Sequence, residues 1–400
     1  MSTLDGRPTG EVVVARGKES PLRARHPWLY SSAIAGVRGA PEPGDLVAVV
    51  DSRGRPLGQG YYNPRSQIAV RLLRFDDGPV DEALWRERLV RAAAAREELT
   101  GETEALRLVN AESDGLPGLV VDRYRDFLVL QALTLGIERR KQALVELLSG
   151  LFSPRGIYER SDVGVRALEG LEPAAGVLSG EPPPPKLEVR EGGVRLLVDI
   201  TSGHKTGLYL DQRENRLLCR ELAAGREVLD VCCYTGGFGV QAAAGGAEAV
   251  LFLEASARHL RWARDHLRLN GLSGVRAGFL AGDAFQELRR LARQGKRFDL
   301  VLLDPPKFAR SAREVPDALR GYRDLNRLCL KLLRSGGLLM TFSCSGRVGW
   351  SELQRAVGLA AADAGCDAQI LRHLSQARDH PVAVSYPEGE YLRGFLIGRW

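Results

Sequence analysis

A cysteine in a polar turn is the residue of this sequence best suited to covalent chemistry. Cys344 lies between Ser343 and Ser345, directly after the apolar run Leu338–Phe342. A thiol at the end of a core strand gains nothing there by burial, and as a thiolate it can act as a nucleophile. Carbon 5 of a pyrimidine is a poor nucleophile, but a thiolate added to carbon 6 makes it enamine-like. Cys344 is therefore the candidate for such an addition, and the alternative is a small residue tolerated in a tight turn.

A glycine-rich turn between Asp230 and Gly239 has the features of a cofactor loop. Glycines after a strand let the backbone turn tightly and approach a ligand. A dinucleotide site would carry G-x-G-x-x-G, whereas the spacing here is Gly236-Gly237-x-Gly239. Asp230 would repel a pyrophosphate but suits a ligand with an ammonium and a sulfonium group. These features favour S-adenosylmethionine over NAD.

Acidic residues follow successive predicted strands beside this turn. Glu254 stands 24 residues after Asp230, where an acidic side chain can bind both ribose hydroxyls. Asp283 follows the next strand and is placed to accept a hydrogen bond from the adenine amino group. A single acid at a strand end is more often a helix cap, but three beside one glycine-rich turn are hard to explain as caps. The predicted cofactor site comprises Asp230, Tyr234, Thr235, Gly236, Phe238, Glu254, Asp283 and Asp304.

The motif Asp304-Pro305-Pro306-Lys307 follows the apolar run Leu300–Leu303. Its two prolines fix the backbone and keep Asp304 at the edge of the sheet, facing the methyl donor. A free thiol has a pKa of about 8.5, so Cys344 needs help from Lys307 or from polarisation of its substrate. Methyltransferases that act on exocyclic amines carry a similar motif, usually with an aromatic residue after the prolines. Lys307 at that position weakens the amine alternative, and we predict Cys344, Asp304 and Lys307 as catalytic residues.

The elements that must position these residues alternate between strand and helix. Apolar strand-like runs are separated by helical stretches, a pattern typical of βαβ units and a doubly wound parallel sheet. The strands are predicted at Val228–Val231, Ala249–Leu253, Ala277–Leu280, Leu300–Leu303 and Leu338–Phe342, and the helices at Gly237–Ala244, Ala257–Leu269, Ala284–Arg293 and Tyr322–Leu333. The fold class is therefore α/β, with a C-terminal Rossmann-like domain over residues 186–400.

Residues 1–75 instead contain short strands between turn signals, typical of a small β-barrel or β-roll. Strands are expected at Glu11–Ala15, Leu46–Val50 and Gln67–Leu73. Residues 76–185 form a predicted central α+β domain that ends in the proline-rich linker Pro182–Pro185. Its predicted elements are a helix at Asp81–Leu99, strands at Leu119–Val121 and Phe127–Leu130, a helix at Glu138–Leu148 and a strand at Gly156–Tyr158.

Charge and composition limit the class of protein. Residues 1–75 carry 11 Arg and Lys against 6 Asp and Glu, whereas the remaining chain is nearly neutral, with 45 against 44. A basic module on a neutral body suggests a polyanion-binding appendage; the alternative is a solvated basic surface. Six cysteines without zinc spacing predict neither a disulfide framework nor a metal site. Since no apolar run has the length of a signal peptide or a membrane span, we expect a cytoplasmic protein without a membrane partner.

With these motifs in view, the chain resembles the large-subunit ribosomal RNA methyltransferase I family over nearly its whole length. The N-terminal part resembles a PUA domain, an RNA-binding barrel. The segments that carry the resemblance are Pro43–Val47, Gly58–Asn63, Asn110–Leu119 and Ser202–Arg213, in order with Asp230–Gly239, Asp304–Lys307 and Ser343–Ser345. The resemblance implies a class I methyltransferase that makes 5-methylcytosine in 23S ribosomal RNA, with S-adenosylmethionine as cofactor and a homodimeric assembly.

The resemblance also bears on the choice of target atom. Relatives that methylate guanine N7 carry Asn where this chain has Cys344, so the cysteine favours carbon 5 of cytosine. Two alternatives stay open: amine methylation of an RNA base with Cys344 incidental, and a non-catalytic RNA-binding assembly protein. The intact acids at the cofactor positions argue against the second alternative.

Overall fold

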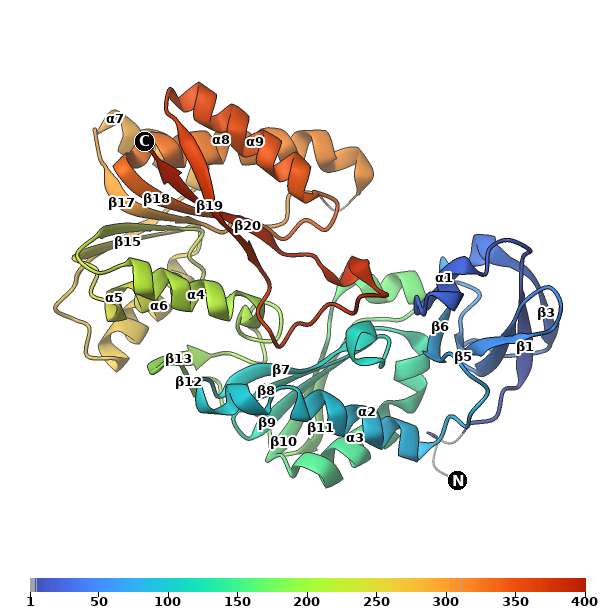
Figure 1. Cartoon of the computed structure of the whole chain (residues 1–400). Coiled ribbons are helices and arrows are strands. Elements are labelled where there is room, and N and C mark those ends of the chain that lie inside the picture. The colour runs from blue at the N-terminus through green and yellow to red at the C-terminus, as the bar shows by residue number, and fades with distance from the viewer. Residues whose placement is uncertain (1–3, 5, 310) are drawn as a thin grey trace. The chain divides into compact units, whose positions relative to one another are not determined.

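Two compact units make up the protein in the computed structural model, which describes residue 4, residues 6–309 and residues 311–400 (Figure 1). The first unit comprises Met1–Val189, Val198–Leu210 and Asp379–Gly389. The second comprises Arg190–Leu197, Asp211–Arg378 and Glu390–Trp400. The chain therefore passes between the units several times. The short strands β12 (Leu187–Glu191) and β13 (Val194–Val198), which pair with each other, contain one such passage each.

The N-terminal sheet of the first unit has the strand order β2-β6-β5-β4-β1-β3. Its strands are β1 (Gly10–Val14), β2 (Trp28–Tyr30), β3 (Ile34–Gly39), β4 (Leu46–Val50), β5 (Pro56–Tyr62) and β6 (Ile68–Arg74), with the short helix α1 (Ser20–Arg23) before β2. Strands β1 and β4 are parallel, and the other neighbours are antiparallel. Strand β5 approaches β6 closely because residue 60 is a glycine: a Cβ there would lie 2.2 Å from the backbone oxygen of Arg71.

The central sheet of the first unit has the order β11-β10-β9-β8-β7. Its strands are β7 (Ala105–Asn110), β8 (Leu119–Tyr124), β9 (Phe127–Ala132), β10 (Gly156–Ser161) and β11 (Ala174–Gly180), and its helices are α2 (Glu82–Ala94) and α3 (Leu135–Phe152). Strands β9 and β10 are parallel and α3 connects them, which makes a βαβ unit. Asp81 and Thr134 cap the N-termini of α2 and α3 with their side-chain oxygens.

One hydrophobic core serves both sheets of the first unit. Tyr61 and Leu73 from the N-terminal sheet belong to the same buried cluster as Trp85 of α2 and Leu130 of β9. A smaller cluster, which includes Val12 and Val70, fills the interior of the N-terminal sheet itself. The N-terminal sheet therefore depends on the central sheet for part of its burial.

The segment Asp379–Gly389 joins the first unit from near the C-terminus of the chain. The carboxylate of Asp379 is fully buried, and its Oδ2 accepts a hydrogen bond from the backbone nitrogen of Arg107 at 2.8 Å. Further along the segment, the ring of Tyr386 packs edge-on against Trp28, with 4.8 Å between the ring centroids. The segment thus contacts both sheets of the unit.

The second unit is a Rossmann-like fold around a sheet of order β16-β15-β14-β17-β18-β20-β19. The strands are β14 (Glu227–Val231), β15 (Ala249–Glu254), β16 (Arg276–Ala281), β17 (Phe298–Leu303), β18 (Leu333–Ser343), β19 (Ala368–Ser375) and β20 (Arg393–Arg399). The strands from β16 to β18 in this order are parallel, and β20 is antiparallel to both of its neighbours.

Helices cover both faces of this sheet. They are α4 (Arg213–Leu222), α5 (Gly237–Ala244), α6 (Ala257–Leu269), α7 (Ala284–Arg293), α8 (Val315–Leu332) and α9 (Trp350–Ala364). Figure 1 shows α4, α5 and α6 on one face and α7, α8 and α9 on the other. Leu325 of α8 and Leu353 of α9 pack with Leu303 and Leu339 of the sheet in one buried cluster.

The predicted strands and helices of this fold are confirmed, but two of them start well before the predicted residue. Strand β18 begins at Leu333 instead of Leu338. Helix α8 begins at Val315 instead of Tyr322. It extends across Pro316, which lies in the first turn, where the missing N–H of a proline costs no hydrogen bond. None of the helices that the structure describes is both long and apolar enough to cross a lipid bilayer.

Candidate active site

Parallel strands bring the predicted site residues to one edge of the sheet. Asp230 is the fourth residue of β14 and Glu254 ends β15, while Asp304 and Cys344 directly follow β17 and β18. These strands are neighbours in the order β15-β14-β17-β18. The chain reverses its winding direction at β14, and ligands of doubly wound sheets bind beyond the carboxyl ends of the strands at such a point. This edge is therefore the candidate active site.

The glycine-rich turn after β14 has an unusual backbone. Cys232, Tyr234 and Gly236 have φ angles of 60°, 51° and 83°, in the left-handed region that side chains disfavour. A Cβ added to Gly236 would lie 2.6 Å from the Cβ of Ala263. Such a tight turn brings backbone close to a ligand at the start of α5, which begins at Gly237.

Asp230 holds this turn and contributes negative charge. Its side chain is buried, and its Oδ2 accepts a hydrogen bond of 2.8 Å from the backbone nitrogen of Gly239. Burial and, to a lesser extent, the nearby carboxylates of Asp304 and Glu254 raise the pKa of Asp230 to about 7, against the hydrogen bond from Gly239, which lowers the pKa. Several acids in one pocket would repel a pyrophosphate and stabilise a cation. The residues present therefore fit S-adenosylmethionine, which carries a sulfonium and an ammonium group.

Glu254 lies between the turn and helix α6. Its Oε2 accepts from the backbone nitrogen of Tyr234 and its Oε1 from that of Ser256, both at 3.0 Å. The carboxylate is half-buried, and a carboxylate accepts about four hydrogen bonds in total. Glu254 is thus held in place with capacity left to bind ribose hydroxyls, which stays a prediction.

Asp283 acts as the N-cap of α7, since its Oδ1 accepts from the backbone nitrogen of Gln286 at 3.0 Å. The ordinary explanation for an acid at a strand end thus holds at this position, and a contact with adenine stays a prediction. Thr235 and Phe238 are buried. The ring of Phe238 lies 5.7 Å from that of Phe342, and a contact of Thr235 or Phe238 with the cofactor stays a prediction.

Sequence reasoning missed His266, a fully buried residue of α6. Its Nδ1 lies 2.9 Å from the backbone oxygen of Thr235, and its Nε2 accepts from the backbone nitrogen of Leu197 at 2.9 Å. His266 thereby fixes the glycine-rich turn from behind. A histidine among helical residues gives no local signal of such a role.

Cys344 differs from most of the other cysteines in its surroundings. Burial raises the pKa of the thiols of Cys219, Cys232, Cys233 and Cys329, which keeps them protonated. Cys232 also faces the carboxylates of Glu254 and Asp304, which raise its pKa further. Cys344 is half-buried, and both of its neighbours, Ser343 and Ser345, are buried.

The two residues that follow the prolines after Asp304 differ in their exposure to solvent. Lys307 is exposed, and its role beside the thiolate stays a prediction. Phe308 is half-buried and packs against Tyr322 of α8, with 5.0 Å between the ring centroids. The aromatic residue nearest the motif thus packs partly against helix α8.

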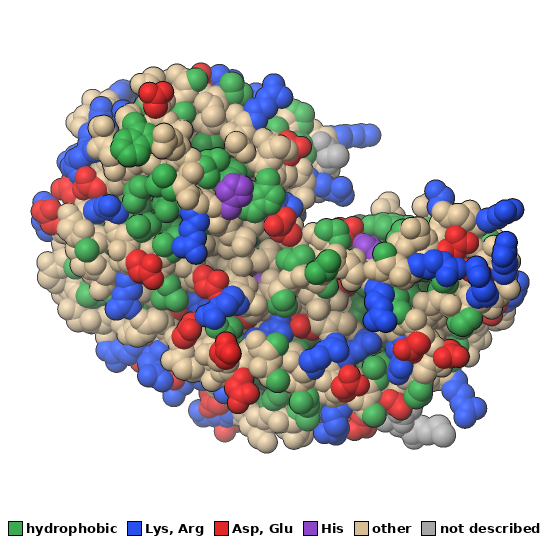
Figure 2. Space-filling model, viewed as in Figure 1, with side chains coloured by type: hydrophobic (Ala, Val, Ile, Leu, Met, Phe, Trp, Pro, Cys, Tyr) green, Lys and Arg blue, Asp and Glu red, His purple; other side chains and the backbone are tan. Residues whose placement is uncertain are grey.

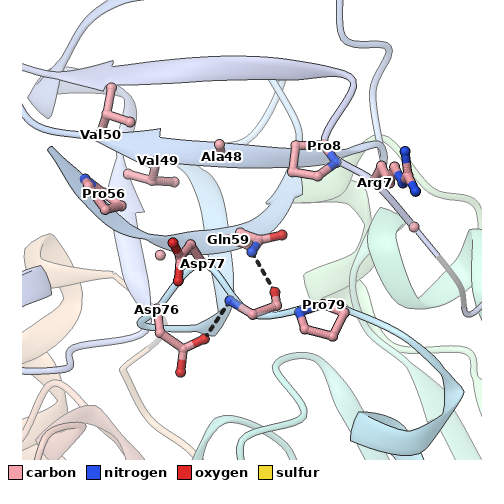
Figure 3. A pocket seen from close by; sticks show the side chains of 13 residues that line it. Arg7, Pro8, Ala48, Val49, Val50, Pro56, Gln59, Asp76, Asp77 and Pro79 are labelled. Carbon is pink, nitrogen blue, oxygen red and sulfur yellow. Dashed lines mark hydrogen bonds between the residues drawn. The ribbon is translucent and has the colours of Figure 1, made fainter. Parts of the chain in front are cut away.

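A separate pocket of about 390 Å³ lies in the N-terminal sheet, between β4, β5 and the loop before α2 (Figure 3). The carboxylates of Asp76 and Asp77 line it. Gly78 closes one side, since its nitrogen donates to Asp76 and its oxygen accepts from Gln59. Arg7 also lines the pocket, and Asp76 forms an ion pair of 2.6 Å with Arg74, so charges of both signs lie at this pocket. Figure 2 shows Lys and Arg side chains elsewhere over β1 to β6.

Comparisons with known proteins agree with this architecture. A family model for S-adenosylmethionine-dependent methyltransferases matches residues 168–358, and a PUA-like domain model matches residues 12–75. A candidate SAM-dependent methyltransferase from Streptococcus mutans has a TM-score of 0.84 at 22% identity, covering 97% of this chain and 99% of that one. A candidate methyltransferase solved with S-adenosylhomocysteine has a TM-score of 0.85, also at 22% identity and the same coverage. The fold is therefore that of a PUA-like domain with a methyltransferase domain.

Closer relatives share the name ribosomal RNA large subunit methyltransferase I. The protein from Klebsiella pneumoniae strain 342 is 44% identical over 387 residues, covering 96% of this chain and 97% of the relative. The protein from Tolumonas auensis is 45% identical over 390 residues, covering 96% and 98%. With the acidic edge of the sheet, these matches identify S-adenosylmethionine as the cofactor. The chain belongs to the ribosomal RNA large subunit methyltransferase I family.

Proposed function

We propose that this protein methylates carbon 5 of a cytosine in 23S ribosomal RNA through a covalent bond between Cys344 Sγ and carbon 6. The observation that carries the proposal is the half-buried Cys344 directly after β18, which pairs with β17, the strand that Asp304 follows. The names of the relatives support large-subunit ribosomal RNA as the substrate. Such a substrate is consistent with a cytoplasmic protein.

The residues of the chain divide the chemistry as follows. The thiolate of Cys344 adds to carbon 6, and the electron pair of the 5,6 double bond becomes available at carbon 5. When bound, S-adenosylmethionine supplies an electrophilic methyl group, which carbon 5 accepts as the sulfur–methyl bond breaks and S-adenosylhomocysteine is left. A base, Asp304 or an ordered water, then removes the proton of carbon 5. The double bond re-forms as the bond between carbon 6 and Sγ breaks.

Asp304 and Lys307 support this addition in the proposal. The half-buried carboxylate of Asp304 holds the base edge near N3 and N4, which orients carbon 6 toward Sγ. Lys307 favours the thiolate by its positive charge. Glu254 binds the ribose hydroxyls, Asp283 the adenine, and Asp230 the positive charge of the cofactor.

The RNA is bound, in this proposal, by the N-terminal PUA-like domain (1–75) and the central domain (76–185), while residues 186–400 carry the chemistry. A stacked cytosine does not expose carbon 6, so the base must leave its stack to react. Phosphate and shape contacts hold the rest of the RNA. The family resemblance supports a homodimer, which analytical ultracentrifugation of the purified protein would test.

Cys344→Ala separates carbon methylation from amine methylation. The variant should lose turnover and keep its affinity for cofactor and RNA, because only the carbon-6 adduct needs the thiol. An RNA with 5-fluorocytosine at the target should trap the unaltered protein as a covalent complex, since fluorine cannot leave as the proton does. Denaturing gels would show this complex, and Cys344→Ala should form none.

Cys366→Ala is the matched control, because Cys366 is also half-buried but lies just after α9 with its Sγ against the oxygen of Ala361. That variant should keep both turnover and the covalent complex. If Cys344→Ala methylated RNA at the rate of Cys366→Ala, the adduct mechanism would be wrong, and amine methylation would replace it.

A further inference from the structure

Tyr322 is a buried residue of α8 whose hydroxyl group meets the turn that carries Cys344. Ser343 Oγ donates to Tyr322 Oη at 2.9 Å, and Tyr322 Oη lies 3.2 Å from Ser345 Oγ. The backbone nitrogen of Ser345 also donates to Ser343 Oγ, at 3.3 Å. One hydroxyl group thus holds both neighbours of the proposed nucleophile.

The same network reaches the loop that follows Asp304. Ser345 Oγ accepts a hydrogen bond from the backbone nitrogen of Ala309 at 3.3 Å. The ring of Tyr322 packs edge-on against Phe308 of that loop. The loop from Asp304 to Ala309 and the turn at Cys344 are therefore tied together at Tyr322, although they follow different strands.

The three hydroxyl groups of this network are hidden from solvent. Tyr322 and Ser345 are 0% exposed and Ser343 is 1% exposed, so each hydroxyl depends on the others for its hydrogen bonds. Burial raises the pKa of Tyr322, and the nearby Cys344 and Asp304 raise it too, against the hydrogen bonds from the serines. Tyr322 therefore stays protonated and can donate. A phenylalanine would fill the same space, so packing alone does not require the hydroxyl.

We infer that Tyr322 is a positioning residue, whose hydroxyl group holds Cys344 and Asp304 at the separation that addition to the base requires. The inference rests on the proposed function, because it assigns Tyr322 to the reaction of Cys344. Tyr322 itself is placed behind the turn and acts through the two serines. Its loss should therefore slow the reaction without changing the binding of either substrate.

Tyr322→Phe tests this directly, with Tyr61→Phe as the matched control. Tyr61 is likewise buried and donates its hydroxyl hydrogen bond to the backbone oxygen of Pro117, but it belongs to the first unit. In Tyr322→Phe, kcat should fall by roughly 10- to 100-fold, as for small displacements of reacting groups. The KM for RNA and the Kd for the cofactor should be unchanged. Tyr61→Phe should keep its kcat, although it loses thermal stability.

A second variant tests whether the loss of kcat comes from the hydrogen-bond network around Tyr322. Ser345→Ala removes the link to Ala309, so it should lower kcat as Tyr322→Phe does, and the double variant should be no slower than either single one. Additive losses, or equal kcat losses in Tyr322→Phe and Tyr61→Phe, would overturn the positioning role. So would a kcat in Tyr322→Phe equal to that of the unaltered protein.

RNA with 5-fluorocytosine distinguishes a failure of this inference from a failure of the proposed function. If the unaltered protein forms the covalent complex, Tyr322→Phe should form it more slowly by the same factor as kcat, and an equal rate would sink the inference. If the unaltered protein forms no complex, the adduct mechanism fails. A loss of kcat confined to Tyr322→Phe and Ser345→Ala would then still support positioning of Asp304.

Discussion

The carboxyl group of Asp230 is held in surroundings that oppose its charge. It is buried beside two other acids, and its raised pKa of about 7 lies above the ordinary value of 3.8. Between these two pH values the folded protein keeps a proton that the unfolded chain releases. The free energy of unfolding without cofactor therefore falls as the pH rises through this window, and the loss is complete above about pH 7. A cationic ligand offsets this cost, which couples the cofactor to stability.

Asp230→Asn should make the protein without cofactor more stable and should weaken cofactor binding. The amide oxygen still accepts from Gly239, but the charge is gone. At pH 8, urea unfolding without cofactor should show an increase in stability of up to about 4 kcal/mol. Calorimetry should show cofactor affinity weaker by roughly 10- to 150-fold, the cost of a lost charged partner.

The pH dependence of binding is the control for this prediction. For the unaltered protein, cofactor affinity should rise between pH 6 and pH 8 as Asp230 ionises, and for Asp230→Asn it should stay nearly flat over this range. Equal pH profiles for the two proteins would show that Asp230 is not the group that titrates.

The sequence predicts the site residues that lie at strand ends, but it does not predict the residues that hydrogen-bond to the site from other elements. Asp230, Glu254 and Asp304 follow apolar runs, and a parallel sheet must bring such positions to one edge. His266 and Tyr322 act through hydrogen bonds to residues more than 20 positions away in the chain. No local pattern marks such partners, because their roles depend on how α6 and α8 pack on the sheet.

The glycine-rich turn after β14 contains a position, Gly236, that tolerates substitution poorly. Gly236 combines a φ of 83° with contact to Ala263, so an added methyl group is disfavoured by both backbone and packing. Gly225, just before β14, has a φ of 69° but nothing within 4 Å of an added Cβ. The two glycines therefore separate the cost of backbone strain from the cost of overpacking.

Gly236→Ala should cost about 2–5 kcal/mol of unfolding free energy, the sum of left-handed strain and overpacking. Gly225→Ala should cost about 1–2 kcal/mol, from strain alone. Urea unfolding measures both, and cofactor affinity should fall only in Gly236→Ala. Equal losses in the two variants would mean that helix α6 moves away from the turn at no cost.

Other elements show why the sequence predicts part of the fold only. The parallel strands β14 to β18 are apolar because helices cover both faces, and such runs are easily recognised. Strand β3 is exposed over most of its length, and β5 contains Pro56, Gly58 and Gly60. Neither has the alternation or the composition of a strand. Both are held as strands by their pairing with neighbouring strands, β3 with β1 and β5 with β4 and β6.

For the molecule as a whole, the shared core of the first unit affects how RNA binding can be tested. Tyr61 and Leu73 are buried with residues of the central sheet, so deletion of residues 1–75 would expose that core. Replacing surface charges leaves it intact. Arg16, Lys18, Arg53 and Arg65 are exposed on the N-terminal sheet and its loops.

Replacing these four residues by Gln should weaken RNA binding and flatten its salt dependence. If all four meet phosphates of single-stranded RNA, the slope of log K against log salt should become shallower by about 3. The matched control replaces Arg293, Lys296, Arg297 and Lys331, which are exposed at the C-terminal ends of α7 and α8. Filter binding at several salt concentrations compares the two, and equal slopes would remove the PUA-like domain from the RNA interface.

The segment Asp379–Gly389 also gives the chain an order of completion during its synthesis. The first unit needs Asp379 for Arg107 and Tyr386 for Trp28, yet the whole run Asp211–Arg378 emerges from the ribosome before them. At ordinary rates of protein synthesis, this run takes on the order of 10–30 s. The first unit is therefore completed late in synthesis, although it begins at the N-terminal end of the sequence. A nascent chain that stops before residue 379 cannot form these contacts.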